Sequence, residues 1–369
     1  MKPLEGLKVV ELARVLAGPW AGQALADLGA EVVKVESPAG DDTRHWGPPF
    51  IERDGDRTAA YYYAANRGKR AVVADFATPE GQQTVREQVA DADILIENFK
   101  LGGLAKYGLD YPSLAALNPR LIYCSITGFG QDGPRAAEPG YDFMIQGLSG
   151  LMSITGTADG APMKVGVAVT DVVAGLNATI GILAAVEQRH RTGRGQHVDL
   201  SLFDSAVALL ANQAMNYLAT GRAPGRLGNA HPNLVPYEAL PVEDGHVIVA
   251  VGNDRQFRAC AGVLGLGALA DDVRFATNAA RVENRGLLGE ILAEATALWP
   301  RAALLAALRD AGVPAGPIND IADAFADPQA VARGLKIAPE GVPGVRGPWR
   351  FSDAELALET TAPTLPRAL

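Results

Sequence analysis

Residues 7–37 read LKVVELARVLAGPWAGQALADLGAEVVKVES, two β-rich runs separated by a glycine turn and a helical pattern. Apolar residues cluster over strand length in residues 7–12 and 31–36, and alanine and leucine recur at helical spacing in residues 17–29 between them. A strand, a helix and a strand of these lengths form a right-handed βαβ unit, which requires a parallel sheet. The stretch therefore predicts an α/β fold.

The turn before the predicted helix departs from the fingerprint of a dinucleotide site. That fingerprint, G-x-G-x-x-G, uses each glycine to bring backbone close to the pyrophosphate. Residues 17–22 read AGPWAG, with one glycine before the helix and the bulky Trp20 near the expected phosphate. Glu36 has about the spacing of a ribose-binding acid, but a solvated strand end explains it equally well. The stretch supports a Rossmann-like fold and argues against an NAD site.

Composition and charge narrow the class of protein. The chain has 369 residues, of which 48% are hydrophobic and 20% charged, the balance of a folded protein with two domains. A net charge of −9 without a basic block disfavours nucleic acid and anionic membranes as partners. Cys124 and Cys260 are isolated and lack metal-ligand spacing, which predicts no metal site and a reducing, cytoplasmic location.

Strand and helix patterns alternate through the first half of the chain and change character near Gly221, where a run rich in Gly, Pro and Asn begins. A hairpin turning on Asp244-Gly245 and several helices follow. We predict a large Rossmann-like domain over residues 1–222, completed by 312–369, and a smaller inserted α+β domain over 223–311. The large domain is expected to hold further strands at 69–74, 93–97 and 121–125 and helices at 78–90, 107–119 and 142–154.

The run VGVAVTDVVAGLNATIGILAAV, residues 165–186, is apolar enough to be mistaken for a membrane span but contains Asp171 and Asn177. We interpret it as a buried strand over 165–169 that leads into a core helix over 172–189. Asp171 then opens that helix, where an N-cap role is the simplest explanation. The same place, at a strand's carboxyl end and a helix's positive pole, suits an ionised carboxylate that attacks an acyl carbon.

Other candidates for chemistry are less specific. The five histidines show no ligand spacing, and no serine lies in a G-x-S-x-G elbow. Six cations near predicted strand ends are either solvated surface charges or a ring that holds a phosphate-rich ligand. They are Arg44, Arg67, Lys69, Arg70, Lys100 and Lys106.

Several motifs together resemble the class III CoA-transferase family: residues 11–50, NRGKRAVVADF, ILIENF, YCSITGFGQDGP, GYDFMIQGLSGLM, GVAVTDVVAG and EQRHRTGRGQHVDLSLFDS. The resemblance covers nearly the whole chain. It implies that the Rossmann-like domain holds the nucleotide part of coenzyme A, and that a CoA thioester is a substrate with no tightly bound cofactor. It also implies an interlocked homodimer that acts on acyl-CoA and a carboxylic acid.

The resemblance assigns roles to individual residues. It implies that Asp171 is the nucleophile, forming first a mixed anhydride and then an aspartyl-CoA thioester. The implied CoA contacts are Leu16, Ala17, Asn66, Lys69, Asn98, Phe99, Lys106 and Tyr141. Ser37 and Pro139 replace an arginine and a lysine of formyl-CoA transferase, which disfavours formate and oxalate chemistry.

The motifs AGDDTRHWGPPF and VPYEAL are most similar to the succinyl-CoA-dependent branch that acts on dicarboxylates such as glutarate. Arg14 and Arg44 then become partners for the distal carboxylate, since a guanidinium offers a bidentate fork. Structural ion pairs explain the same two residues equally well.

Two alternatives to CoA transfer remain. Racemases of the family resemble one another in a GHD motif whose His is paired with the later Asp, so that two bases exchange the α-proton of the substrate, whereas residues 140–142 here read GYD. A tyrosine with a pKa near ~10 is a poor base at neutral pH, which favours transfer over racemisation or epimerisation. The other alternative is a relative without turnover that only binds acyl-CoA.

Overall fold

The opening stretch forms the predicted βαβ unit in this computed structural model, which describes residues 1–366. Strand β1 (Lys8–Glu11) is followed by α1 (Ala17–Asp27) and β2 (Glu31–Glu36), and the two strands pair in parallel with Val9 opposite Val32. Gly22 allows α1 to approach the sheet, because a β-carbon there would lie 1.8 Å from Glu11 Oε2. This glycine, which lies within α1, therefore serves packing between α1 and β1.

Six parallel strands form the main sheet, in the order β5-β2-β1-β6-β7-β8. The strands beyond the first unit are β5 (Lys69–Val73), β6 (Ile94–Glu97), β7 (Ile122–Thr127) and β8 (His197–Ser201). On one side of β1, the chain adds β2 and then β5. It then crosses back and adds β6, β7 and β8 on the other side of β1. In open sheets of this kind, ligands bind at the carboxyl ends of the strands where the direction switches. The switch point here lies between β1 and β6.

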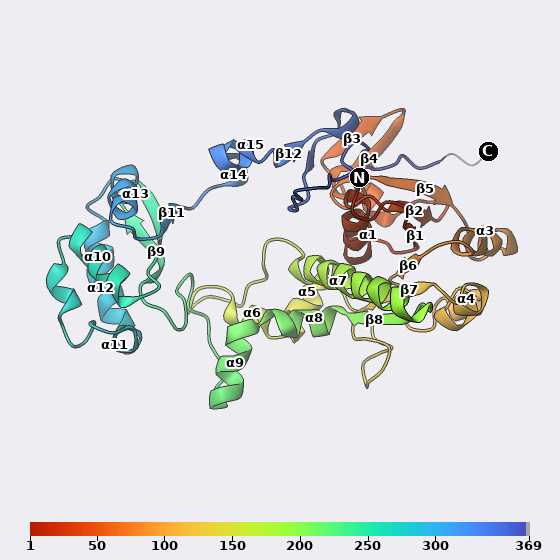
Figure 1. Ribbon diagram of the computed structural model, residues 1–369. Coiled ribbons are helices and arrows are strands. Elements are labelled where there is room, and N and C mark those ends of the chain that lie inside the picture. The colour runs from red at the N-terminus through yellow and green to blue at the C-terminus, as the bar shows by residue number, and fades with distance from the viewer. Residues whose placement is uncertain (367–369) are drawn as a thin grey trace. The chain divides into compact units, whose positions relative to one another are not determined.

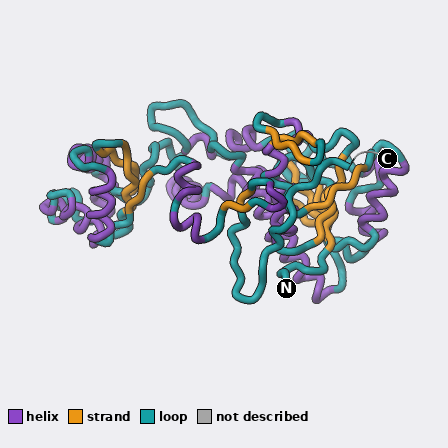
Figure 2. Tube along the Cα trace, turned by 90° about the horizontal axis from the view of Figure 1, so that it is seen from above, coloured by secondary structure: helices purple, strands orange, loops and turns teal. Residues whose placement is uncertain are grey.

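Helices cover both faces of this sheet (Figures 1 and 2). One core packs α1, α7 (Val169–Thr192) and α8 (Leu202–Leu209) against Val9, Val32 and Ile94. The other packs α3 (Pro79–Val89) and α4 (Tyr111–Leu117) against Val10 and Leu95. Adjacent residues of one strand thus enter opposite cores, as the alternation of side chains along a strand requires.

The remaining elements of this part of the chain are short or peripheral. The antiparallel pair β3 and β4 follows a 3-10 turn, and a second pair, β12 and β13, lies near the C-terminal end. Their bounds are β3 (Phe50–Arg53), β4 (Asp56–Ala59), α2 (Ala60–Tyr63), α5 (Asp142–Leu148), α6 (Leu151–Ile154), α9 (Ala211–Thr220), α15 (Pro328–Ala332), β12 (Lys336–Ile337) and β13 (Gly344–Val345).

The segment before Asp171 differs from the prediction. Residues 165–168 form no strand; α7 begins at Val169 and ends at Thr192, where Gly193 adopts a left-handed conformation with φ 72°. The predicted strand over 165–169 is therefore wrong, because an apolar run of this length cannot by itself be assigned to a strand or a helix. Helix α7 has the length and apolar composition of a membrane span, and it packs within the core beside α1.

A second compact unit comprises residues 153–163 and 223–327, and the first comprises the described residues of 1–152, 164–222 and 328–366. The second unit has a three-stranded antiparallel sheet, β11-β10-β9, and its own core. Its elements are β9 (Tyr237–Val242), β10 (Gly245–Ala250), α10 (Asp254–Val263), α11 (Asn278–Glu283), α12 (Arg285–Thr296), α13 (Arg301–Asp310), β11 (Ala315–Pro317) and α14 (Ile321–Ala326).

The boundary predicted at residues 311/312 moves to 327/328. The reason is that β11 pairs antiparallel with β10, with Gly316 opposite Ile248, so the return segment completes the second unit's sheet. Residues 367–369 of the predicted large domain lie outside the described residues.

Candidate active site

A cavity of about 460 Å³ lies at the switch point of the main sheet. The turn after β1 and the loop after β6 form two of its walls, and the first turn of α7 brings Asp171 to it. Seven residues predicted from the sequence line this one cavity: Arg14, Leu16, Ala17, Asn98, Phe99, Tyr141 and Asp171. The topology therefore gathers residues from positions 14 to 171 at the place where α/β folds bind ligands.

Asp171 lies inside the first turn of α7 and is not its N-cap. The N-cap residue is Ala168, whose side chain makes no capping bond, so the simple capping explanation for Asp171 is wrong. Burial raises the pKa of Asp171 to about 7, and the nearby carboxylate of Asp142 adds to the rise. The positive end of the helix opposes these effects and stabilises the ionised form. Asp171 is thus a carboxyl group whose pKa lies near neutral pH, in a partly desolvated site.

Asp142 organises the start of α7. Its Oδ1 accepts hydrogen bonds from the Thr170 backbone N at 2.9 Å and from Thr170 Oγ1 at 2.7 Å. Its Oδ2 accepts a bond from Gln146 Nε2 at 2.8 Å. These bonds hold the residue preceding Asp171, so Asp142 both positions that carboxylate and repels its negative charge.

Tyr61 is a neighbour of this pair that the sequence analysis missed. Burial raises the pKa of its phenol, and the charges of Asp171 and Asp142 raise it further. Its ring meets Trp46, a cavity residue, edge to face with centroids 5.3 Å apart. No spacing signal links residue 61 to residue 171, because the fold alone brings them together.

The turn after β1 is held in a strained conformation. Val15 has φ 70°, which a β-branched residue rarely adopts. The side chain of Asn98 clamps the turn, accepting a bond from Arg14 N at 2.9 Å and donating one to Arg14 O at 2.7 Å. The Arg14 guanidinium is about half exposed and 3.4 Å from Asp42. Asn98 therefore shapes the cavity through the backbone, while Arg14 keeps donors for a ligand.

Lys106 lies at an adjoining pocket of about 310 Å³. Phe76 and Phe99 contribute its apolar surface, and Arg14 and Lys100 also line it. Cations around an apolar floor suit a ligand with an aromatic ring and phosphates. Among residues 1–366, no group of three His, Cys, Asp or Glu is placed to hold a metal ion.

Asn66, Lys69 and Arg44 lie outside both pockets. Lys69 Nζ donates to Glu11 Oε1 at 2.9 Å, to the Pro19 carbonyl at 2.9 Å and to Asn66 Oδ1 at 2.8 Å, which uses all three of its donors. Burial lowers the pKa of Lys69 to about 8. Both residues are buried in the core, so the position of their side chains does not support the predicted CoA contacts of Lys69 and Asn66, which stay predictions.

Arg44 is buried in the same manner. Its Nε and Nη2 donate to the two carboxylate oxygens of Glu36 at 2.8 and 2.6 Å, and Tyr62 lies beneath the guanidinium. The predicted substrate role of Arg44 is therefore corrected to a structural ion pair. We call the linked set Glu11, Lys34, Glu36, Asp41, Arg44 and Lys69 the buried ionic cluster.

The family is identified by comparison with known proteins. The model of CoA-transferase family III matches residues 4–367. The chain therefore belongs to CoA-transferase family III and is an enzyme of that class.

Individual relatives agree with this. The chain is 57% identical to a succinate–glutarate CoA-transferase of Agrobacterium fabrum, over 98% of this chain and 93% of that protein. It is 44% identical to a mouse succinyl-CoA:glutarate CoA-transferase, over 91% of this chain and 76% of that protein. A crystal structure of a CaiB/BaiF family protein from Brucella suis superposes with a TM-score of 0.90 at 62% identity, covering 99% and 97% of the two chains.

Proposed function

We propose that the enzyme transfers CoA from succinyl-CoA to a dicarboxylic acid such as glutarate. The names of the two relatives, at 57% and 44% identity, support this choice of substrates. The observation that carries the reaction is the position of Asp171, a desolvated carboxylate at a helix N-terminus in the cavity at the switch point. A CoA thioester is thus a substrate rather than a resident cofactor.

The reaction begins with attack of an Asp171 oxygen on the thioester carbonyl of the donor. A C–O bond forms, the C–S bond breaks, and CoA leaves as a thiolate, which gives a mixed anhydride. The thiolate then attacks the Asp171 carbonyl of the anhydride and releases the donor acid, leaving an aspartyl-CoA thioester. The acceptor carboxylate repeats the two steps in reverse and departs as its CoA thioester, which restores Asp171.

The environment of Asp171 suits this cycle. Burial removes the water that would otherwise solvate the nucleophile and hydrolyse the anhydride. The first turn of α7 favours the anionic state. Because the pKa is about 7, the carboxylate is ionised in a substantial fraction of molecules at neutral pH.

We assign the distal carboxylate of the acceptor to Arg14. This guanidinium lines the cavity with Asp171, is half exposed, contacts Asp42 at 3.4 Å and lies over the Phe99 ring, 5.4 Å from its centroid. A guanidinium can hold a carboxylate through two parallel bonds. Arg44 has no such freedom because Glu36 already occupies its fork.

We assign CoA to the turn and loops around the two adjoining pockets. Leu16, Ala17, Phe99 and Tyr141 contact the thioester arm in the cavity, and Lys106 with Lys100 faces the phosphates. Asn98 contributes by holding the Arg14 turn.

The proposal extends to assembly and location. We propose an interlocked homodimer in the cytoplasm, in which the second unit acts as a domain inserted into the first. The chain crosses between the units near residues 152/153, 163/164, 222/223 and 327/328, and the last two crossings lead into and out of most of the second unit. Cys124 and Cys260 are buried free thiols, in keeping with a reducing compartment. Light scattering that showed a monomer at micromolar concentration would contradict the dimer.

One experiment tests the activity. The enzyme is incubated with succinyl-CoA and a panel of mono- and dicarboxylic acids, and new thioesters are sought by mass spectrometry. Formation of glutaryl-CoA supports the proposal, and its absence with every acid overturns it. Deuterium uptake at the α-carbon of a 2-methylacyl-CoA without any acceptor would indicate a racemase instead, and binding without either reaction would indicate an acyl-CoA binder.

A further inference from the structure

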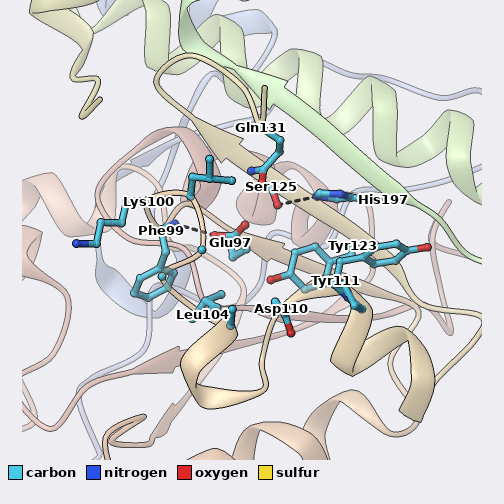
Figure 3. Close-up of a pocket in the computed structure, with 15 residues that line it drawn as sticks. Glu97, Phe99, Lys100, Leu104, Asp110, Tyr111, Tyr123, Ser125, Gln131 and His197 are labelled. Carbon is cyan, nitrogen blue, oxygen red and sulfur yellow. Dashed lines mark hydrogen bonds between the residues drawn. The ribbon is translucent and has the colours of Figure 1, made fainter. Parts of the chain in front are cut away.

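A separate cavity of about 330 Å³ lies on the other side of the loop after β6 and has no part in the proposed reaction. Its size is at the lower end of the range for ligand pockets. We call it the β6–β8 pocket and define it by Glu97, Asp110, Tyr111, Tyr123, Ser125 and His197 (Figure 3). These residues come from β6, the start of α4, β7 and β8, and all belong to the first unit.

The polar groups of this pocket are buried. Glu97 is 5% exposed and Ser125 is 2% exposed, although both line the cavity. Glu97 Oε2 accepts a bond from Phe99 N at 2.7 Å, and Ser125 Oγ lies 2.9 Å from His197 Nε2. These groups therefore already have protein partners, as buried polar groups normally do, and a ligand would meet them through their remaining lone pairs.

One carboxylate oxygen of Asp110 has no hydrogen-bond donor within residues 1–366. Asp110 occupies the N-cap position of α4 but its side chain makes no capping bond. Its Oδ1 is buried and accepts no hydrogen bond within residues 1–366. An aspartate at a helix start normally satisfies a backbone N–H there, and leaving a buried charged oxygen unpaired is costly. The arrangement therefore calls for a donor supplied from the cavity.

Two carboxylates, Glu97 and Asp110, line the pocket, and burial raises the pKa of Glu97 to about 7. Burial raises the pKa of Tyr123 first, and the charges of Glu97 and Asp110, which line the same pocket, raise it further. Lys100, the one lysine or arginine that lines the pocket, is exposed and extends away from the other labelled side chains (Figure 3). Carboxylates and phosphates are thus disfavoured, so this pocket does not suit the anionic substrates of the enzyme.

The walls of the pocket are aromatic. Tyr111 stacks on His197 with ring centroids 5.0 Å apart, and meets Tyr123 edge to face at 5.8 Å. Aromatic faces attract cations and cover apolar groups. We propose that the β6–β8 pocket binds a small organic ammonium ion, with its nitrogen between Glu97 and Asp110 and its apolar part against Tyr111 and Tyr123. This binding does not depend on the proposed function.

Calorimetric titration of the full chain with benzylammonium tests the proposal. Benzyl alcohol and benzoate have the same ring with a neutral or an anionic head group, and so serve as controls. We expect a dissociation constant of about 1 mM or below for benzylammonium, and binding at least ~10-fold weaker for both controls. Benzoate or benzyl alcohol binding as well as benzylammonium would overturn the proposal, and so would a lack of binding by all three.

Matched substitutions locate the ligand. Glu97→Gln and Asp110→Asn keep shape while removing one charge each, and each is expected to weaken benzylammonium binding ~10-fold. Glu87→Gln, at an exposed position of α3, removes the same charge outside the pocket and should leave binding unchanged. Asp110→Asn keeps the test decisive if Glu97→Gln fails to fold.

Competition separates the two cavities, because Phe99, Lys100 and Leu101 line both. Saturating CoA should leave the stoichiometry of benzylammonium binding at one per chain. Stoichiometric displacement by CoA would place the probe beside Asp171 and overturn the assignment, whatever the outcome of the transfer assay.

Discussion

The cavity beside Asp171 and the buried ionic cluster both contain charged side chains removed from water. The charges of the cluster are paired with one another, whereas the carboxylate of Asp171 is not paired within the described part of the chain. In the cluster, Lys34 bonds Glu11 at 3.0 Å and lies 3.0 Å from Asp41. Burial by itself would lower the pKa of Lys34, but these carboxylates outweigh it and raise the pKa to about 12. In the cavity, Asp171 forms no salt bridge within residues 1–366, and burial raises its pKa instead.

The difference teaches how to separate structural charge from reactive charge. A buried charge that is fully paired holds the fold and has nothing left for a ligand. A desolvated charge left without a counter-ion is destabilising, and such groups concentrate at sites of chemistry. The two regions should therefore respond to substitution in opposite ways, in activity for the cavity and in stability for the cluster.

The largest effect is expected at Asp171. Asp171→Ala removes the nucleophile and should lower kcat by about 10⁴-fold, equivalent to ~5.5 kcal/mol of barrier. CoA binding should remain near that of the wild type, since other residues hold CoA, and the free energy of unfolding should not fall, because the substitution removes a desolvated charge. Steady-state kinetics, CoA titration and urea unfolding measure the three. Asp132→Ala, at an exposed position, is the control, and near-normal turnover of Asp171→Ala would contradict the covalent mechanism.

Arg44→Met should act on stability. Removing one partner of a buried ion pair leaves Glu36 uncompensated and is expected to cost about 3–5 kcal/mol of unfolding free energy. The ratio of rates with glutarate and valerate should not change in the folded fraction. Urea unfolding and the two acceptor assays check this. A loss of dicarboxylate preference with unchanged stability would return Arg44 to the substrate site.

Arg14→Met should change the specificity for the acceptor acid and leave the stability of the protein unchanged. A charge-assisted pair in a partly dry site contributes roughly 1.5–3 kcal/mol, or about ten- to hundredfold in specificity. We expect the preference for glutarate over valerate to disappear, while urea unfolding stays unchanged because Arg14 is half exposed. Arg14→Lys keeps the charge but loses the fork, so it should retain only part of the preference. Equal rates with glutarate and valerate in the wild-type enzyme would refute the assignment of Arg14 to the distal carboxylate of the acceptor.

The smallest effect is a shift in pH dependence. Attack requires ionised Asp171, so kcat/KM should rise with pH below about 7 and level off above it. Asp142→Asn removes the repelling charge but not the burial, so the midpoint should move to lower pH and stay above 3.8. The amide oxygen can still accept the bonds from Thr170. A profile unchanged by Asp142→Asn would assign the rise in pKa to burial alone.

Local sequence patterns were enough to predict a parallel sheet and the positions of most of its strands. The alternation of strand and helix patterns predicted the parallel arrangement, and β1, β2, β5, β6 and β7 lie within one or two residues of the predicted ranges. These signals are local, because hydrophobic periodicity and turn residues act over a few positions. Motif resemblance likewise identified the family, and it selected Asp171 among the many aspartates of the chain.

Only the tertiary structure decided which charged side chains are available. Arg14 and Arg44 looked equivalent as residue types, yet the register of β2 and the turn after it deliver Glu36 to Arg44 and leave Arg14 at the cavity. Lys69 meets Glu11 across a sequence separation of 58 residues, because β5 and β1 flank β2 in one sheet. The β6–β8 pocket likewise joins residues 97 to 197. Pairing across such distances depends on strand order and packing, for which local sequence patterns carry no signal.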